Sequence, residues 1–149
     1  MRILIVEDDL FKLNALKCFI EKHFKHCKID VARSYQTGCN AAFSDKYDLL
    51  ILDMTLPNFD IVNNDNGGNT LKNGGELIMR ELLEENEHFN AVIISQYETF
   101  GGETIEQIDN RLKSLCSSKY HGWITYSTNN NDWQEKLLNT IKNVINSNN

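Results

Sequence analysis

Residues 3–9, with the sequence Ile-Leu-Ile-Val-Glu-Asp-Asp, join an unbroken apolar run to a cluster of acidic residues. A second apolar run, Leu-Leu-Ile-Leu at residues 49–52, ends in the same way at Asp53. Continuous apolar runs of this length are typical of parallel strands that are buried on both faces of a sheet. The carboxyl ends of parallel strands meet at one edge, so we expect Glu7, Asp8 and Asp53 to converge there.

Three carboxylates in one crevice repel one another, so either a cation neutralises them or one of them takes a proton. Oxygen ligands favour a hard cation, and the acidic cluster therefore predicts a Mg2+ site. The alternative is that strand-end carboxylates simply cap a helix or lie in solvent. Asp9, directly before the first predicted helix, is suited to that capping role.

The rest of the chain alternates between predicted strands and helices. Strands are predicted near residues 2–7, 28–32, 48–53, 91–95 and 122–126, and helices near residues 9–24, 34–45, 75–85 and 105–116, with a last helix after 129–131. In the first helix, the apolar residues at helical spacing are Leu10, Phe11, Ala15, Cys18 and Phe19. We therefore expect an α/β fold, a five-stranded parallel sheet with helices on both faces, of the flavodoxin-like (βα)5 type.

Residues 58–73 interrupt this alternation. The segment is rich in Asn and Gly and lacks helical periodicity, which is typical of a loop, and about seventeen residues separate Pro57 from Gly75. Asp65-Asn66-Gly67 could turn a small hairpin within it. A lid remains an alternative, but we expect a partner-binding element or a disordered insertion within a single domain of residues 1–149. Residues 146–149 are expected to fray.

Composition restricts the possible partners. The chain of 149 residues has 15 Lys and Arg against 21 Asp and Glu, a net charge of -6. That balance disfavours direct binding to nucleic acid or to an anionic membrane, and no apolar stretch is long enough to span a bilayer. Four cysteines without a C-x-x-C pair are expected to be free thiols in a cytoplasmic protein, with a zinc site at His23, His26 and Cys27 as a minor alternative.

These motifs resemble the receiver domains of two-component response regulators. Residues 3–9 resemble the first strand and acidic pair of that family, and residues 47–57 resemble its third strand, phosphoacceptor aspartate and following proline. Residues 75–82 resemble the start of its third helix, and residues 92–95 resemble its fourth strand, which ends in Thr or Ser. The resemblance extends over about residues 1–145.

The resemblance implies a role for each matched position. Asp53 would accept a phosphoryl group from a histidine kinase or a phosphotransfer protein. Glu7 and Asp8 would form the acidic pocket, and Mg2+ would be bound by Asp8, Asp53 and the backbone carbonyl of Thr55.

Two further positions would pass the signal on. Ser95 would hydrogen-bond a phosphoryl oxygen, and Trp123 would be the switch aromatic. The output would be an altered contact with a downstream protein or with a second copy of the chain in a homodimer. No enzyme activity is expected beyond phosphorylation and dephosphorylation of Asp53 itself.

One departure from the family pattern concerns the strand-five lysine. Tyr126 stands at its position, and Tyr can donate a hydrogen bond but carries no cation. Lys72 in the long loop, or less plausibly Lys119, could supply the missing charge. Tyr97 could crowd an attacking water and slow loss of the phosphoryl group.

The missing lysine leaves three functions to compare. The first is a Mg2+-dependent phosphoacceptor receiver. The second is a pseudo-receiver, of the same fold, that acts as a protein-interaction module without phosphorylation. The third, an aspartate-nucleophile phosphohydrolase, is disfavoured because Thr55 stands where that chemistry would use a second acid.

Overall fold

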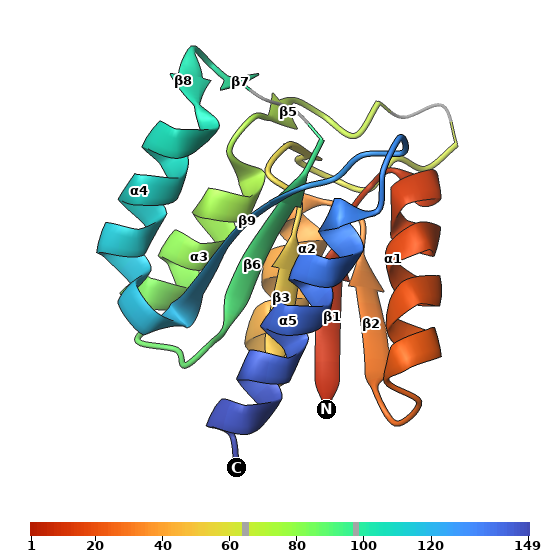
Figure 1. Cartoon of the computed structure of the whole chain (residues 1–149). Coiled ribbons are helices and arrows are strands. Elements are labelled where there is room, and N and C mark those ends of the chain that lie inside the picture. Colours follow the sequence, from red (N-terminus) through yellow and green to blue (C-terminus); the bar gives the residue numbers. More distant parts are fainter. Residues whose placement is uncertain (64–65, 97–98) are drawn as a thin grey trace.

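A computed structural model describes residues 1–63, 66–96 and 99–149 and has a central parallel sheet (Figure 1). The strand order is β2-β1-β3-β6-β9. These strands are β1 (Arg2–Val6), β2 (Lys28–Ala32), β3 (Leu49–Leu52), β6 (Ala91–Ser95) and β9 (Tyr120–Thr125). The order reverses between β1 and β3, which is the switch point of a flavodoxin-like sheet, so the predicted fold class is confirmed.

Helices cover both faces of the sheet (Figure 1). They are α1 (Leu10–His23), α2 (Tyr35–Ser44), α3 (Gly74–Glu84), α4 (Ile105–Cys116) and α5 (Asp132–Ser147), with a short 3-10 helix, η1 (Ser117–Lys119), before β9. Side chains alternate along β1, so that Ile3 and Ile5 pack with α1 and α5, whereas Leu4 and Val6 pack in a second core with α3 and α4. Each face therefore has its own hydrophobic core.

The buried face of α1 differs from the one expected. Leu10 and Phe11 are 54% and 75% exposed, and Cys18 is also exposed, whereas the buried positions include Lys12, Leu16 and Ile20. These three residues are spaced four apart and share one side of the helix. Asp9 caps the helix as predicted, because its Oδ1 accepts hydrogen bonds from two backbone N–H groups of the first turn.

The ends of the inserted segment take part in a small hairpin. The short strands β4 (Leu56–Pro57) and β5 (Thr70–Leu71) pair antiparallel, and the N–H of Phe59 donates to the carbonyl of Gly67 at 2.9 Å. The predicted turn residue Asp65 lies outside the described residues. A second small hairpin, β7 (Thr99–Phe100) with β8 (Glu103–Thr104), precedes α4.

The C-terminal segment is more ordered than expected, since α5 continues to Ser147. Among the described residues, no helix combines the length and the apolar character that crossing a membrane requires.

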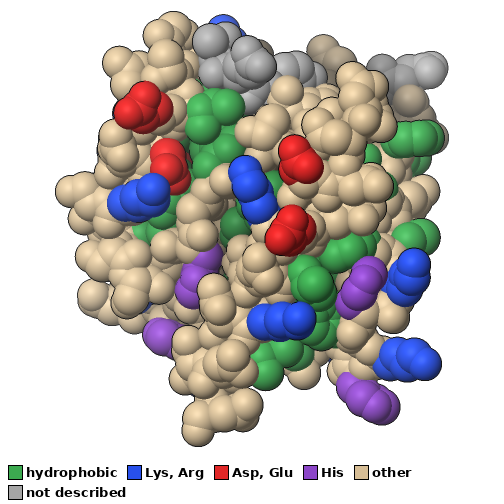
Figure 2. All heavy atoms as spheres, viewed as in Figure 1, with side chains coloured by type: hydrophobic (Ala, Val, Ile, Leu, Met, Phe, Trp, Pro, Cys, Tyr) green, Lys and Arg blue, Asp and Glu red, His purple; other side chains and the backbone are tan. Residues whose placement is uncertain are grey.

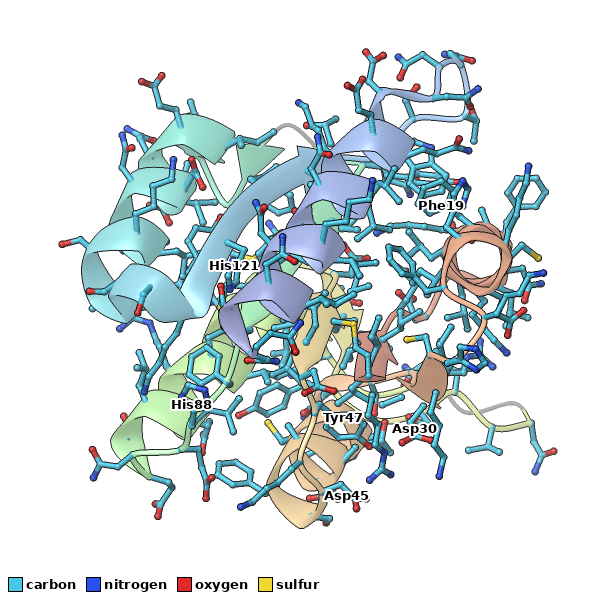
Figure 3. The ribbon with its side chains drawn as sticks, turned by 60° about the horizontal axis from the view of Figure 1, so that its bottom comes forward. Phe19, Asp30, Asp45, Tyr47, His88 and His121 are labelled. Carbon is cyan, nitrogen blue, oxygen red and sulfur yellow. The ribbon has the colours of Figure 1, made fainter. Side chains whose placement is uncertain are left out.

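An ionic network closes the amino-terminal edge of the sheet. Arg2 makes salt bridges to Asp30 at 2.7 Å and to Asp45 at 2.9 Å, and its guanidinium lies 4.9 Å from the ring centroid of Tyr47. Figure 3 shows Asp30, Asp45 and Tyr47 gathered at this end of the molecule. The acidic cluster lies at the opposite, carboxyl-terminal edge, so the two groups of charges are separated by the length of the strands.

Candidate functional site

The register of β1 and β3 brings the three predicted acids together. Val6 and Leu52 are paired, and the N–H of Asp53 donates to the carbonyl of Val6 at 3.0 Å. One carboxylate oxygen from each of Glu7, Asp8 and Asp53 lies within 4.8 Å of the others. Glu7 and Asp53 are buried, and Asp8 is partly exposed. The predicted convergence of these acids is therefore confirmed.

The acids open into a cavity of about 250 Å³. Its walls include Thr55 and Gln96 beside the strand ends, and Ile61 and Asn66 from the hairpin segment. The inserted segment 58–73 thus borders the acidic site. Thr55, which the family resemblance implies as a backbone ligand, lies on the wall of the cavity two residues after Asp53.

A buried lysine, absent from the predicted site, completes this cluster. Lys12 has a side chain that is 1% exposed, and its Nζ lies 2.5 Å from Glu7 Oε2 and 3.3 Å from Asp53 Oδ1. The same Nζ donates to the backbone carbonyl of Ile94 at 2.6 Å. An ammonium has three N–H donors, and here three acceptors surround it. The helix α1 therefore delivers a fixed cation to the acids of β1 and β3.

Burial and charge act in opposite directions on these groups. Burial raises the pKa of Glu7 to about 8, and the nearby Asp53 charge adds to this rise, although the Lys12 ammonium opposes it. Burial also raises the pKa of Asp8, with a further contribution from Asp53. Burial alone would lower the pKa of Lys12, but Asp53 and Glu7 outweigh it, so that pKa is raised and the ammonium stays charged. The crowded carboxylates thus favour an additional positive charge.

The donor set fits a hard divalent cation. All three side chains offer carboxylate oxygens, which are the ligands that Mg2+ prefers. Both oxygens of Glu7 already accept hydrogen bonds, Oε2 from Lys12 and Oε1 from the N–H of Asp9 at 3.0 Å. This arrangement favours Asp8 and Asp53 as the direct ligands and leaves Glu7 as the hydrogen-bonded partner of Lys12.

The predicted switch residues lie on β6 and β9. Ser95 is fully buried at the carboxyl end of β6, one residue before Gln96 of the cavity wall. Trp123 pairs with Ile93 across β6 and β9 and makes an edge contact with the ring of Phe100, at 5.3 Å between centroids. Ser95 is therefore near the acids, and Trp123 lies further back along the neighbouring strand.

Neither lysine proposed as a replacement supplies the missing charge. Lys119 lies at the other end of β9, where its Nζ donates to the carbonyl of Glu87 at 3.1 Å. Lys72 is exposed, and its side chain lies beside Gly101 of the second hairpin. Tyr126, at the position of the family lysine, is buried with its ring centroid 5.9 Å from Lys12 Nζ. Tyr97 lies outside the described residues, so its expected role stays a prediction.

One signal in the sequence could have identified Lys12. It shares a helical face with Leu16 and Ile20, at a spacing of four residues, and that face is buried. A lysine on the apolar face of a helix that follows an acidic strand end indicates a paired, buried cation. The apolar residues Leu10 and Phe11, which are exposed, obscure the spacing of Lys12, Leu16 and Ile20 in the sequence.

Two curated proteins are similar to this chain over most of its length. The Detocs response regulatory protein DtcB of Enterobacter cloacae is 28% identical over 149 residues, which cover 95% of this chain and 98% of the relative. An uncharacterized protein of Sinorhizobium fredii, y4jR, is 28% identical over 147 residues, which cover 93% of this chain and 95% of the relative. No family model matches the sequence.

Solved structures of response regulators share the fold. A two-component response regulator from Clostridium difficile superposes with a TM-score of 0.64 at 20% identity, covering 100% of this chain and 98% of the other. The response regulator TrrA of Thermotoga maritima, in complex with Mg2+-BeF, superposes with a TM-score of 0.58 at 22% identity, covering 96% and 97%. The architecture is thus that of response regulator receiver domains, as the motifs indicated.

Proposed function

We propose that this chain is a receiver that accepts a phosphoryl group on Asp53, with Mg2+ bound by Asp8, Asp53 and the backbone carbonyl of Thr55. The observation that carries the proposal is the convergence of three carboxylates within 4.8 Å at the switch point of the sheet. The Mg2+-BeF complex of the Thermotoga maritima protein supports it, because that protein has the same fold. A bound Mg2+ would neutralise the carboxylates and the phosphoryl oxygens that approach them.

The reaction in this proposal is transfer from a phosphohistidine of a histidine kinase or phosphotransfer protein. A carboxylate oxygen of Asp53 forms a bond to phosphorus while the P–N bond breaks, and the leaving imidazole takes a proton from solvent. The product is an acyl phosphate on Asp53. The N–H of Met54, which donates to Asp53 Oδ1 at 2.8 Å, holds the carboxylate in place for this attack.

Phosphorylation would then alter a protein-binding surface. The added group brings roughly two negative charges to the strand ends, close to Ser95. Trp123 is suited to a change of side-chain position, because among the described residues its buried indole Nε1 has no hydrogen-bond acceptor. A groove beside Trp123 runs between α4 and α5, and Figure 2 shows charged and hydrophobic side chains interspersed on this face.

The proposed setting is a signalling protein of the cytoplasm. The downstream partner would be a protein, or a second copy of this chain, that contacts the α4-β9-α5 face. The only chemistry expected of the chain is phosphorylation and dephosphorylation of its own Asp53.

The pseudo-receiver alternative depended on the missing strand-five lysine. The buried ammonium of Lys12, 3.3 Å from Asp53 Oδ1, weakens that argument because the pocket contains a fixed cation. The phosphoacceptor function is therefore the one that the geometry supports best.

The test is incubation with acetyl phosphate or phosphoramidate and Mg2+, followed by intact-mass measurement. We expect a mass gain of one phosphoryl group that hydroxylamine removes, as it does from acyl phosphates, and that Asp53→Asn abolishes. Asp132→Asn is the matched control, since Asp132 is exposed at the start of α5, and it should retain the gain. An unmodified wild-type chain with both donors would overturn the proposal in favour of the pseudo-receiver.

A further inference from the structure

We infer that Lys12 contacts the phosphoryl group on Asp53 and so replaces the strand-five lysine of the receiver family from a different element, α1. This inference rests on the proposed phosphoacceptor function. It assigns to α1 a role in binding the transferred group, in addition to its role in covering the sheet.

The geometry fixes the ammonium of Lys12 against Glu7 and Asp53, two of the acids that line the cavity. Its contacts come from three different strands: Glu7 follows β1, Asp53 follows β3, and Ile94 lies in β6. With the side chain only 1% exposed, water has little access to the charge. A cation held in this way needs little reorganisation when an anionic group arrives beside Asp53.

Tyr126 fills the position at the end of β9 where the receiver family has its lysine, while the cation comes from Lys12 on α1. Its buried ring lies 5.9 Å from Lys12 Nζ and packs 5.3 Å from the ring of Trp133 in α5. The aromatic side chain thus occupies the space beyond the end of β9, between Lys12 and α5. A lysine at both positions would place two ammonium groups in one small site, where they would repel each other.

The three contacts of Lys12 are not equivalent. The contact with Asp53 is 3.3 Å, whereas those with Glu7 and Ile94 are 2.5 and 2.6 Å. The Asp53 contact is therefore the weakest, and it is the one that gives way when the acyl phosphate forms. Lys12 then donates that hydrogen bond to a phosphoryl oxygen while Glu7 and Ile94 hold the ammonium in position.

A purely structural role for Lys12 makes a different prediction. A lysine that only neutralises buried Glu7 would, when removed, disturb the pocket and weaken every ligand. A lysine that contacts the phosphoryl group competes with Mg2+ for the carboxylates but attracts the anion. Its removal should therefore tighten Mg2+ binding and weaken binding of a phosphoryl analogue.

The experiment measures both affinities by calorimetry, Mg2+ alone and then beryllofluoride at saturating Mg2+. For Lys12→Gln we expect beryllofluoride binding about 10- to 100-fold weaker, the value of one hydrogen bond between charged groups. Mg2+ binding should become about threefold tighter or more, because a competing positive charge is gone. Lys22→Gln, an exposed position on the same helix, should change neither affinity.

A second variant tests the exchange of positions directly. Lys12→Gln combined with Tyr126→Lys returns the cation to β9, and it should recover most of the beryllofluoride affinity. If Lys12→Gln binds both Mg2+ and beryllofluoride more weakly, and the double variant does not recover beryllofluoride affinity, the inference is overturned and Lys12 has only a structural role.

Two further outcomes are distinguished by the wild-type protein. A wild type that binds no beryllofluoride and gains no phosphoryl group contradicts the proposed function itself. If the wild type binds beryllofluoride and gains the phosphoryl group, and Lys12→Gln does so equally well, only the role of Lys12 is contradicted. If the variants do not fold, the 15N resonance of Lys12 Nζ is measured in the wild type. The inference requires this resonance to shift when beryllofluoride binds, and an unchanged resonance would contradict it.

Discussion

Gly75 lies so close to Asp53 that a Cβ atom on Gly75 would be 2.5 Å from the Asp53 carbonyl oxygen. The N–H of Gly75 also donates to the carbonyl of Met54 at 3.3 Å. The first turn of α3 therefore packs directly on the backbone that carries the predicted phosphoacceptor. Backbone atoms cannot rotate away as a side chain can, so the position of α3 and the position of Asp53 depend on each other.

Gly75→Ala should consequently destabilise the fold and disturb the acidic site. We expect a loss of about 1–3 kcal/mol in the free energy of unfolding, the usual cost of overpacking a buried position, together with weaker Mg2+ binding. Gly74→Ala is the control, because its added methyl would meet only side-chain atoms of Leu56, at 3.0 Å and beyond, and these can adjust. Urea unfolding and Mg2+ calorimetry measure the two effects, and equal losses in both variants would contradict the explanation.

Arg111 should stabilise the contact between α3 and α4. Its Nη2 donates to Glu76 Oε1 at 2.7 Å, and its Nη1 pairs with Glu103. Glu76 is 5% exposed but keeps a second partner in Arg80 at 2.9 Å. Arg111→Met should therefore reduce the free energy of unfolding by only about 1–2 kcal/mol, less than the loss of a fully buried partner.

Lys113→Met provides the comparison on the same helix. Lys113 pairs with Asp109 at 2.7 Å, but its side chain is 58% exposed, and a pair of that kind contributes about 0–1 kcal/mol. If Lys113→Met and Arg111→Met lower the free energy of unfolding equally, the contact of Arg111 with buried Glu76 contributes no more than an exposed ion pair.

His121 should make stability depend on pH. Burial lowers the pKa of His121 below its ordinary value of 6.5, and its Nε2 is 2.9 Å from Asn90 Oδ1. The unfolded chain therefore binds a proton near that ordinary value while the folded chain does not, so the free energy of unfolding falls as pH drops through it. Figure 3 shows His121 near α5.

The measurement is urea unfolding at a series of pH values between about 8 and 5. His121→Gln should remove part of the decrease on the acid side. His26→Gln, at an exposed position, should keep the wild-type slope. An unchanged slope in His121→Gln would show that burial of this imidazole is not the cause.

The thiols should react at different rates. Cys18 is exposed, Cys27 and Cys39 are partly buried, and Cys116 is 3% exposed in the core. A thiol reagent should label Cys18 first and Cys116 only on unfolding, as mass spectrometry of the peptides can follow. Early labelling of Cys116 would instead indicate that α4 opens readily from the sheet.

Much of the site could be predicted because it depends on strand order. Glu7, Asp8 and Asp53 follow apolar runs, and parallel strands bring such positions to one edge. The periodic segments also predicted the five main strands and five main helices, with ends that differ by a few residues at most.

The remaining features depend on tertiary contacts. Lys12 is buried because the acids around it compensate the cost of removing an ammonium from water. The spacing of Leu16 and Ile20 places Lys12 on the inner face of α1, but the partners of its charge are set by tertiary contacts. The hairpin formed by β4 and β5 depends on two strands of two residues each, which are too short to give a periodic signal.

The origin of Lys12 in α1 confines the ionic chemistry of the pocket to residues 7–53. In the proposed receiver, the last strand and helix would then contribute an aromatic wall, formed by Tyr126 and Trp133, and a binding surface. A chimera that exchanges β9 and α5 while retaining Tyr126 and Trp133 should thus keep its electrostatic balance. In evolution, the surface formed by β9 and α5 could in the same way change without altering the charges around Asp53.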